Sequence, residues 1–282
     1  MKKQQIIVVG GGVVLLVVLL LFGNMKPPVK AGTGATASVP VEKFDIQTVI
    51  KGATANLTES QQAYVNGLSE AVVRGDVKEQ KIKNYRQLAS FWSDTARAFI
   101  PFAYYTAEAA KLENSEKSLT FAARILLDNL RGVDQPGLKT WLASESKELF
   151  EKAIVLNPGS DSLQVGLGST YIFGASAENP QAVMQGIQKI LEVSRKDSTN
   201  LYAQKMLGIG GIVSGQYDKA VERLEKVAEA EPHDLEVLLM LAEGYERKGD
   251  KAKASNWYER AAEHIQNPAL KAELEKRIKQ LK

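Results

Sequence analysis

The chain has 282 residues, long enough for one or two domains with a sizeable core. It contains no cysteine, which excludes disulfides, thiolate metal sites and thiol nucleophiles. Only two histidines are present, His233 and His264, and their wide separation along the sequence argues against most zinc and Ser-His-Asp chemistry. We therefore predict no catalytic residue, no metal and no cofactor.

The formal net charge of +3 has a local origin, because four lysines flank one apolar run near the N-terminus: Lys2, Lys3, Lys26 and Lys30. The rest of the chain is close to neutral, with both signs interspersed. Such a body lacks the basic stripe that nucleic-acid binding requires, so no nucleic-acid partner is predicted.

The apolar run from Ile6 to Phe22 contains no polar side chain and is just long enough to cross a bilayer core of roughly 30 Å. It is long for the apolar core of a signal peptide, and the small-residue pattern at Ala35-Thr36-Ala37 lies well beyond it. We predict a cytoplasmic tip and a single transmembrane anchor in residues 1–22, with a removed signal peptide as the alternative. The short N-terminal tail favours an N-in protein of the bacterial inner membrane, with the bulk of the chain periplasmic or otherwise extracytoplasmic.

Residues 23–57 contain Pro27-Pro28, the run Gly32-Thr33-Gly34 and few large apolar side chains. A segment of this composition buries too little surface to offset its chain entropy. It predicts a flexible tether between the anchor and the body.

From residue 58 the pattern is helical and nothing reads as a strand. Thr58 to Gln61 forms a capping-box signature, and Pro101 inside a helical pattern predicts a kink or a helix end. Turn residues follow at Gly75-Asp76, Asn114-Ser115, Asn157-Pro158, Glu231-Pro232 and Gly249-Asp250. The body is predicted to be all-α, with residues 58–140 forming degenerate helical repeats.

Size-matched residues then recur 34 positions apart: Leu207 and Leu241, Gly215 and Gly249, Ala220 and Ala254, Val227 and Ala261. One unit earlier, residues 167–171 read Leu-Gly-Ser-Thr-Tyr. This spacing and the Leu-Gly-x-x-Tyr core resemble the tetratricopeptide repeat (TPR), a helix-turn-helix unit. The resemblance implies a right-handed TPR solenoid of about five helix pairs, with repeats over residues 141–267.

The final segment, residues 268–282, follows an Asn267-Pro268 start signal. It carries one apolar stripe of Leu270, Leu274, Ile278 and Leu281 at helical spacing. A single stripe of this kind predicts a capping helix for the last repeat.

Four glycines within residues 207–215 raise the alternative of a phosphate-binding loop, but a dinucleotide fingerprint would need glycine in place of Val213. The repeat register instead puts Gly208 where two helices approach and Gly211 where other repeats carry tyrosine. Gly215 falls at a helix end, where glycine adopts the left-handed conformation. Gly210 is left without a role.

In the tetratricopeptide family the first helix of each pair lines a partner-binding groove, and the resemblance carries that role to fourteen positions here. They are Val165, Ser169, Ile172, Phe173, Tyr202, Lys205, Met206, Ile209, Ile212, Val213, Glu236, Leu239, Met240 and Glu243. The groove is predicted to be apolar at its centre and acidic towards its C-terminal end. It suits an amphipathic helix or an extended apolar segment of a partner protein. The alternative is that these side chains pack internally.

The sequence thus favours a non-enzymatic, membrane-tethered scaffold or adaptor that mediates protein–protein interactions in the bacterial envelope. By analogy with other proteins of this fold and layout, we expect the protein to assist secretion or envelope assembly. One alternative is a structural homo-oligomer that associates through the inner face or the region around Trp92 and Trp141. Another is an enzyme with its site in residues 58–140.

Overall fold

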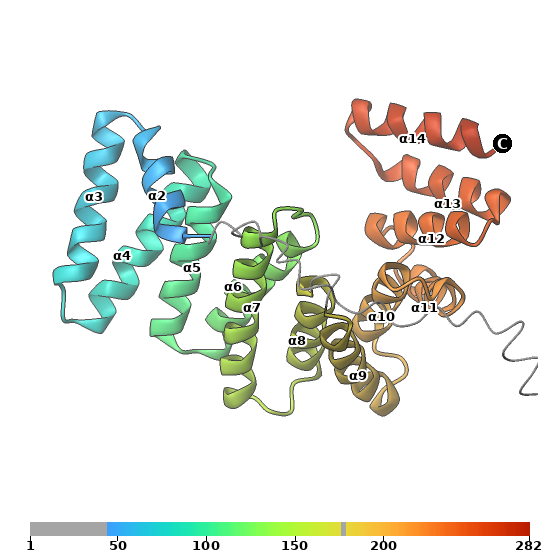
Figure 1. Ribbon diagram of the computed structural model, residues 1–282, viewed down its shortest axis with the longest axis horizontal. Coiled ribbons are helices and arrows are strands. Elements are labelled where there is room, and N and C mark those ends of the chain that lie inside the picture. The colour runs from blue at the N-terminus through green and yellow to red at the C-terminus, as the bar shows by residue number, and fades with distance from the viewer. Residues whose placement is uncertain (1–43, 176–178) are drawn as a thin grey trace, which may run out of the picture. The chain divides into compact units, whose positions relative to one another are not determined.

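A computed structural model describes residues 44–175 and 179–282, and these fold into α-helices and one π-helical turn without a strand (Figure 1). The predicted all-α class is therefore confirmed for these residues. The predicted anchor, Ile6 to Phe22, and residues 23–43 of the predicted tether lie outside the described residues. In the part of the chain that is described, no helix combines the length and the apolar character needed to cross a membrane.

The helices belong to one compact unit, Glu42–Lys282. In chain order they are α2 (Ile46–Ala55), α3 (Glu59–Arg74), α4 (Lys78–Ser90), the π turn η1 (Phe91–Thr95), α5 (Phe99–Glu113), α6 (Glu116–Leu130), α7 (Pro136–Leu156), α8 (Asp161–Gly174), α9 (Pro180–Lys196), α10 (Leu201–Val213), α11 (Tyr217–Ala230), α12 (Leu235–Arg247), α13 (Lys251–His264) and α14 (Pro268–Leu281).

The closest helix packing occurs within five consecutive pairs, α4–α5, α6–α7, α8–α9, α10–α11 and α12–α13, as expected from the repeats. The bounds of α12 and α13 equal those of α10 and α11 moved along the chain by one repeat. Neighbouring pairs also contact each other through their first helices, α6 with α8, α8 with α10 and α10 with α12. We call the face formed by these first helices the inner face.

Local sequence signals fix most of the helix ends. Thr58 and Gln61 form a complete capping box at the start of α3, and the side chain of Asp250 caps α13. Asn267 caps α14 immediately before Pro268. Gly215 and Gly249 follow α10 and α12 with φ of +76° and +83°, a conformation that L side chains rarely adopt.

Three apolar clusters of the described residues stabilise the unit, the smallest of them around Ile278. The larger of the other two runs through α5 to α13 and includes the fully buried Leu126, Leu149 and Leu224. The smaller joins α2, α3, α4, η1 and α5 around Trp92, whose side chain is 1% exposed. Helix α14 buries Ile278 against α12 and α13, so it covers the last pair as the sequence predicts.

The helical body begins earlier than predicted, because residues 46–55 of the expected tether form α2. Ile46, Val49, Ile50 and Ala53 give this segment an apolar face at helical spacing, and Asp45 caps it. Ile50 packs into the smaller cluster. The tether prediction overlooked this face because it weighed average composition over the whole segment.

Pro101 lies in the first turn of α5, where its missing N–H needs no partner. The preceding chain is interrupted after η1, and Arg97 has a left-handed φ of 49°. The helical pattern therefore breaks before the proline, and no kink is needed within α5.

Candidate inner-face binding site

The glycine-rich stretch is part of a packed helix. Gly208, Gly210 and Gly211 all lie within α10, and the phosphate-loop alternative fails because no loop is present there. A Cβ added at Gly208 would come within 2.5 Å of Leu224 Cγ, and one at Gly210 within 3.3 Å of Ile172 Cδ1. Gly210, which the sequence left unassigned, thus lets α10 approach α8.

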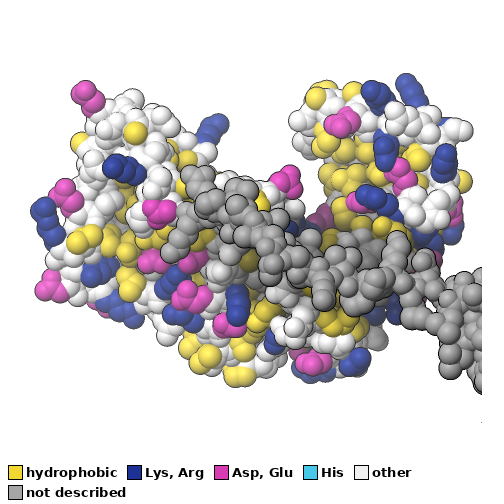
Figure 2. All heavy atoms as spheres, viewed as in Figure 1, with side chains coloured by type: hydrophobic (Ala, Val, Ile, Leu, Met, Phe, Trp, Pro, Cys, Tyr) yellow, Lys and Arg dark blue, Asp and Glu magenta, His cyan; other side chains and the backbone are white. Residues whose placement is uncertain are grey.

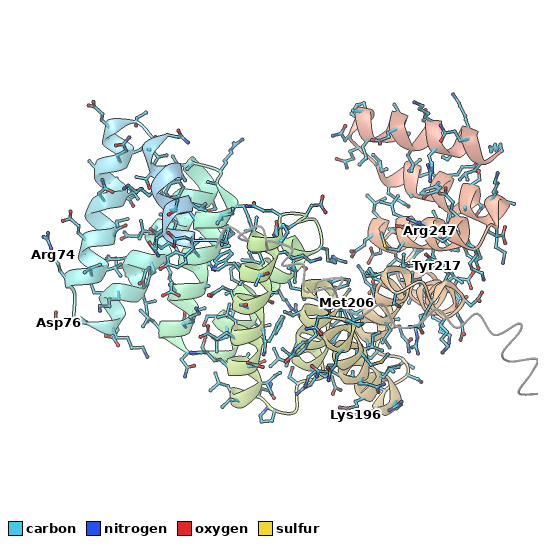
Figure 3. The ribbon with its side chains drawn as sticks, in the orientation of Figure 1. Arg74, Asp76, Lys196, Met206, Tyr217 and Arg247 are labelled. Carbon is cyan, nitrogen blue, oxygen red and sulfur yellow. The ribbon has the colours of Figure 1, made fainter. Side chains whose placement is uncertain are left out.

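The apolar members of the predicted groove are core residues, which corrects the prediction of an apolar centre. Val165, Ile172, Phe173, Met206, Ile209 and Ile212 are at most 7% exposed. Met206 lies among the side chains between α8 and α10 (Figure 3). The first helices pack directly on one another, so these side chains are covered by neighbouring repeats, as the internal-packing alternative holds.

Two further residues of the predicted groove differ in their exposure to solvent. Ser169 is fully buried, and its hydroxyl donates a hydrogen bond to the Val165 carbonyl oxygen at 2.8 Å. Val213, at the end of α10, is 62% exposed.

The accessible part of the inner face is ionic. Lys205 on α10 donates to Asp234 Oδ2 at 2.6 Å and lies 2.8 Å from Glu236 Oε2. Glu236 also pairs with Arg131, which follows α6, and the Arg131 guanidinium lies 5.4 Å from the centroid of the Phe173 ring. Side chains from four successive helix pairs therefore converge here.

The electrostatics of Lys205 follow from two opposing causes. Burial lowers the pKa of its ammonium group, but the hydrogen bonds that it donates to Asp234 and Glu236 outweigh burial, so the pKa of Lys205 is raised. The lysine is thus held charged at neutral pH, between two carboxylates.

Helix α6 supplies residues that sequence reasoning missed. Arg124, Asp128 and Arg131 follow one another at i, i+4 and i+7 and share one side of the helix. The Arg124 guanidinium lies 5.8 Å from the centroid of the Tyr202 ring and donates to Ser162 Oγ at 3.3 Å. This spacing is visible in the sequence. Residues 58–140 could not be aligned with the repeats, however, so the sequence did not predict that α6 lies near α10 and α12.

Asp128 on α6 lies close enough to these charged groups to interact with them electrostatically. Its side chain is solvent-exposed, yet surrounding protein raises its pKa, chiefly by burial, with Arg131 opposing that effect. We call the residues that these contacts connect the inner-face cluster: Arg124, Asp128, Arg131, Tyr202, Lys205 and Glu236. Its paired charges and aromatic rings suit a polar or charged partner segment better than the apolar one predicted.

The remaining predicted residues lie at the C-terminal end of the inner face. Leu239 packs with the Ile278 cluster and Met240 with the main core. Glu243 pairs with Arg247 at 3.4 Å and lines a cavity of about 540 Å³ between α12 and α14. Helix α14 thus borders this end, held by an ion pair between Arg277 and Glu246.

The two histidines meet in space although they are distant in sequence. His233 Nδ1 and His264 Nε2 are 3.4 Å apart, because the turn before α12 lies beside the end of α13. Among the residues that the structure describes, no group of three or more His, Cys, Asp and Glu side chains has an arrangement that could hold a metal ion. The wide separation of His233 and His264 along the chain therefore did not predict that they are in contact.

The aromatic region proposed for self-association is largely enclosed. Trp92 is buried in the smaller cluster, so its side chain is not exposed to a second copy of the chain. Trp141 is half-buried, with its ring centroid 5.7 Å from that of Phe44. Figure 2 shows charged side chains of both signs scattered over the visible face.

Comparison with known proteins supports the repeat assignment. The tetratricopeptide repeat family model matches residues 213–276, and no curated protein matches the chain. The solved structure of PilW, described as a widely conserved type IV pilus biogenesis factor, is 16% identical, with a TM-score of 0.50 over 71% of this chain and 85% of that one.

Two other solved structures have lower scores. PilF of Pseudomonas aeruginosa is 15% identical, with a TM-score of 0.47 over 72% of this chain and 85% of that one. A MamA protein is 19% identical, with a TM-score of 0.41 over 65% of this chain and 91% of that one. The likeness to PilW is one of fold. The chain therefore contains a tetratricopeptide repeat in its C-terminal part within an all-helical, TPR-like fold, and repeats of this type bind protein partners.

Proposed function

We propose that this protein is a non-enzymatic scaffold or adaptor that captures a partner protein on the inner face of its repeats. The observation that carries the proposal is the convergence of Arg131, Lys205 and Glu236 from separate helix pairs in one partly exposed ionic cluster. Tetratricopeptide repeats bind protein partners, and their fold is generally a non-catalytic scaffold.

The proposal includes a membrane tether. Support comes from the sequence alone, through the apolar run Ile6 to Phe22 and the Pro- and Gly-containing segment after it. In this account the chain is a single-pass protein of a bacterial inner membrane, and its repeats work outside the cytoplasm in secretion or envelope assembly. The anchor fixes the position, and docking on the inner face recruits the partner.

A crosslinking pull-down from intact membranes tests this function. We compare the native chain with an Arg131→Gln, Lys205→Gln variant, which removes two positive charges from the inner-face cluster. The control is Lys219→Gln, Lys226→Gln, the same change of charge at exposed positions of α11. Thermal melting followed by circular dichroism checks that each variant folds.

The proposed function predicts that one partner protein disappears with the inner-face variant and persists with the control. Unchanged partners with a folded inner-face variant would contradict it. Light scattering over a range of concentrations tests the homo-oligomer alternative, which requires the mass to rise with concentration.

A further inference from the structure

A second surface lies beside the inner-face cluster, in a region that the family model does not match. Helices α4, α5 and α6 enclose a trough of about 870 Å³. Its apolar lining includes Ala89, Phe102, Ala109 and Ala110. The three alanines leave room for larger side chains to enter, and the volume lies within the range of protein binding pockets.

One helix face borders the trough with both apolar and charged groups. Lys117, Phe121 and Arg124 follow one another on α6 at i, i+4 and i+7, so they share one side of that helix. Phe121 is 59% exposed, which is unusual for a large aromatic ring beside an apolar hollow. Arg124 belongs to the inner-face cluster too, so the trough continues directly from it.

Only some of the charged side chains around the trough form ion pairs. Arg86 is paired with Glu113 at one rim. Lys117 and Arg124, on either side of Phe121, have no carboxylate within ion-pair distance among the described residues. Glu116 is also unpaired in this part of the chain, but it lies in the first turn of α6, where the positive end of the helix dipole offsets its charge. The stripe beside the trough is therefore cationic; the Arg124 charge also acts on Asp128, which lies one turn further along α6 and does not line the trough.

From this arrangement we infer that the trough binds an acidic amphipathic segment of a partner protein. A large apolar side chain of the segment packs on Phe121 and the alanines, and flanking carboxylates pair with Lys117 and Arg124. This inference rests on the proposed scaffold function and adds the chemical class of the partner.

The test uses the full-length chain and fluorescein-labelled synthetic peptides. One peptide carries leucines along one helical face and glutamates beside them; its twin has lysine in place of every glutamate. Fluorescence anisotropy gives the affinity for each. The acidic peptide is expected to bind and its basic twin to bind far more weakly. Phe121→Ser should lower the affinity for the acidic peptide about tenfold, because packing on the ring is lost.

A charge-swapped variant tests the ionic part. Lys117→Glu, Arg124→Glu should reverse the preference, so that the basic twin binds better than the acidic peptide. Val155→Ser on α7, an exposed apolar position that does not line the trough, is the matched control for Phe121→Ser and should leave the affinity unchanged. Equal binding of the two peptides, no binding of either, or no effect of Phe121→Ser would each overturn the inference.

Two outcomes separate this inference from the proposed function. If the trough variants have no effect while Arg131→Gln, Lys205→Gln still loses its partner, the inference fails and the scaffold function stands. If light scattering shows a dimer that Phe121→Ser dissociates and the acidic peptide does not, a second copy of the chain occupies the trough and the acidic-segment assignment is wrong.

Discussion

At the scale of single residues, glycines set how closely the helices approach. A Cβ at Gly168 on α8 would lie 2.8 Å from the Gly186 carbonyl oxygen on α9 and 2.6 Å from Ile190 Cγ1. Backbone carbonyls cannot move aside without shifting the helix. The small position that the repeat register assigned to glycine in α8 is therefore a steric requirement.

Gly168→Ala should lower the free energy of unfolding by about 1–3 kcal/mol, because the added methyl group overpacks the α8–α9 contact. Gly67→Ala on α3 is the control, since no heavy atom lies within 4 Å of its added Cβ. That control should raise stability by about 0.5–1 kcal/mol through helix propensity. Urea unfolding measures both changes, and an equal shift in the two variants would argue against close packing at Gly168.

Tyr258 gives the stability a dependence on high pH. Burial, with the nearby Glu246 carboxylate, raises its pKa from 10.0 to about 12, and its hydroxyl donates to Glu246 Oε2 at 3.1 Å. The unfolded tyrosine loses its proton near its ordinary pKa, whereas the folded one keeps it. Its contribution to stability is therefore complete below the unfolded pKa and is lost as pH rises towards the folded value.

Tyr258→Phe should remove this dependence. Between about pH 9 and about pH 11 the variant should lose about 1 kcal/mol less stability than the native chain, which corresponds to roughly one pKa unit of linkage. Urea unfolding at the two pH values provides the comparison. Parallel losses in both proteins would mean that the tyrosine does not titrate differently in the folded state.

At the scale of helices, several ends between α10 and α14 could be predicted because local residues mark them. Asp250 and Asn267 mark starts, and Gly215 and Gly249 mark ends. Helix α2 was missed because its apolar face follows a segment rich in proline and glycine. A helix cap can be recognised from residues that are neighbours in the sequence. Whether a segment forms a helix also depends on the surface against which it packs, and the sequence does not show that surface.

The capping helix α14 should depend on its buried apolar stripe. Ile278→Asp places a charge at a position that is 7% exposed against α12 and α13, and should cost about 2–4 kcal/mol. Lys279→Asp, one residue further on the exposed side, is the matched control and should change stability by less than about 0.5 kcal/mol. If the two variants unfold at the same urea concentration, α14 does not pack as described.

At the scale of the whole molecule, the repeat period predicted the pairing of helices but not the surface that they leave open. Ile209 and Met206 were assigned to the groove, although both are buried in the larger apolar cluster. Arg131 could not be placed opposite Glu236, because residues 58–140 carry no repeat register to align them. Burial and long-range ion pairs arise from how successive repeats stack, which one repeat alone does not specify.

The central claim is that the inner-face cluster contacts a partner protein. The most direct measurement incorporates the photo-crosslinking residue p-benzoylphenylalanine in place of Tyr202, which lies in that cluster, or in place of Glu222, which is exposed on α11. Illumination of intact membranes should yield a discrete crosslinked partner from position 202 and none from position 222. Crosslinks from position 222 alone, or none from either, would contradict partner capture on the inner face.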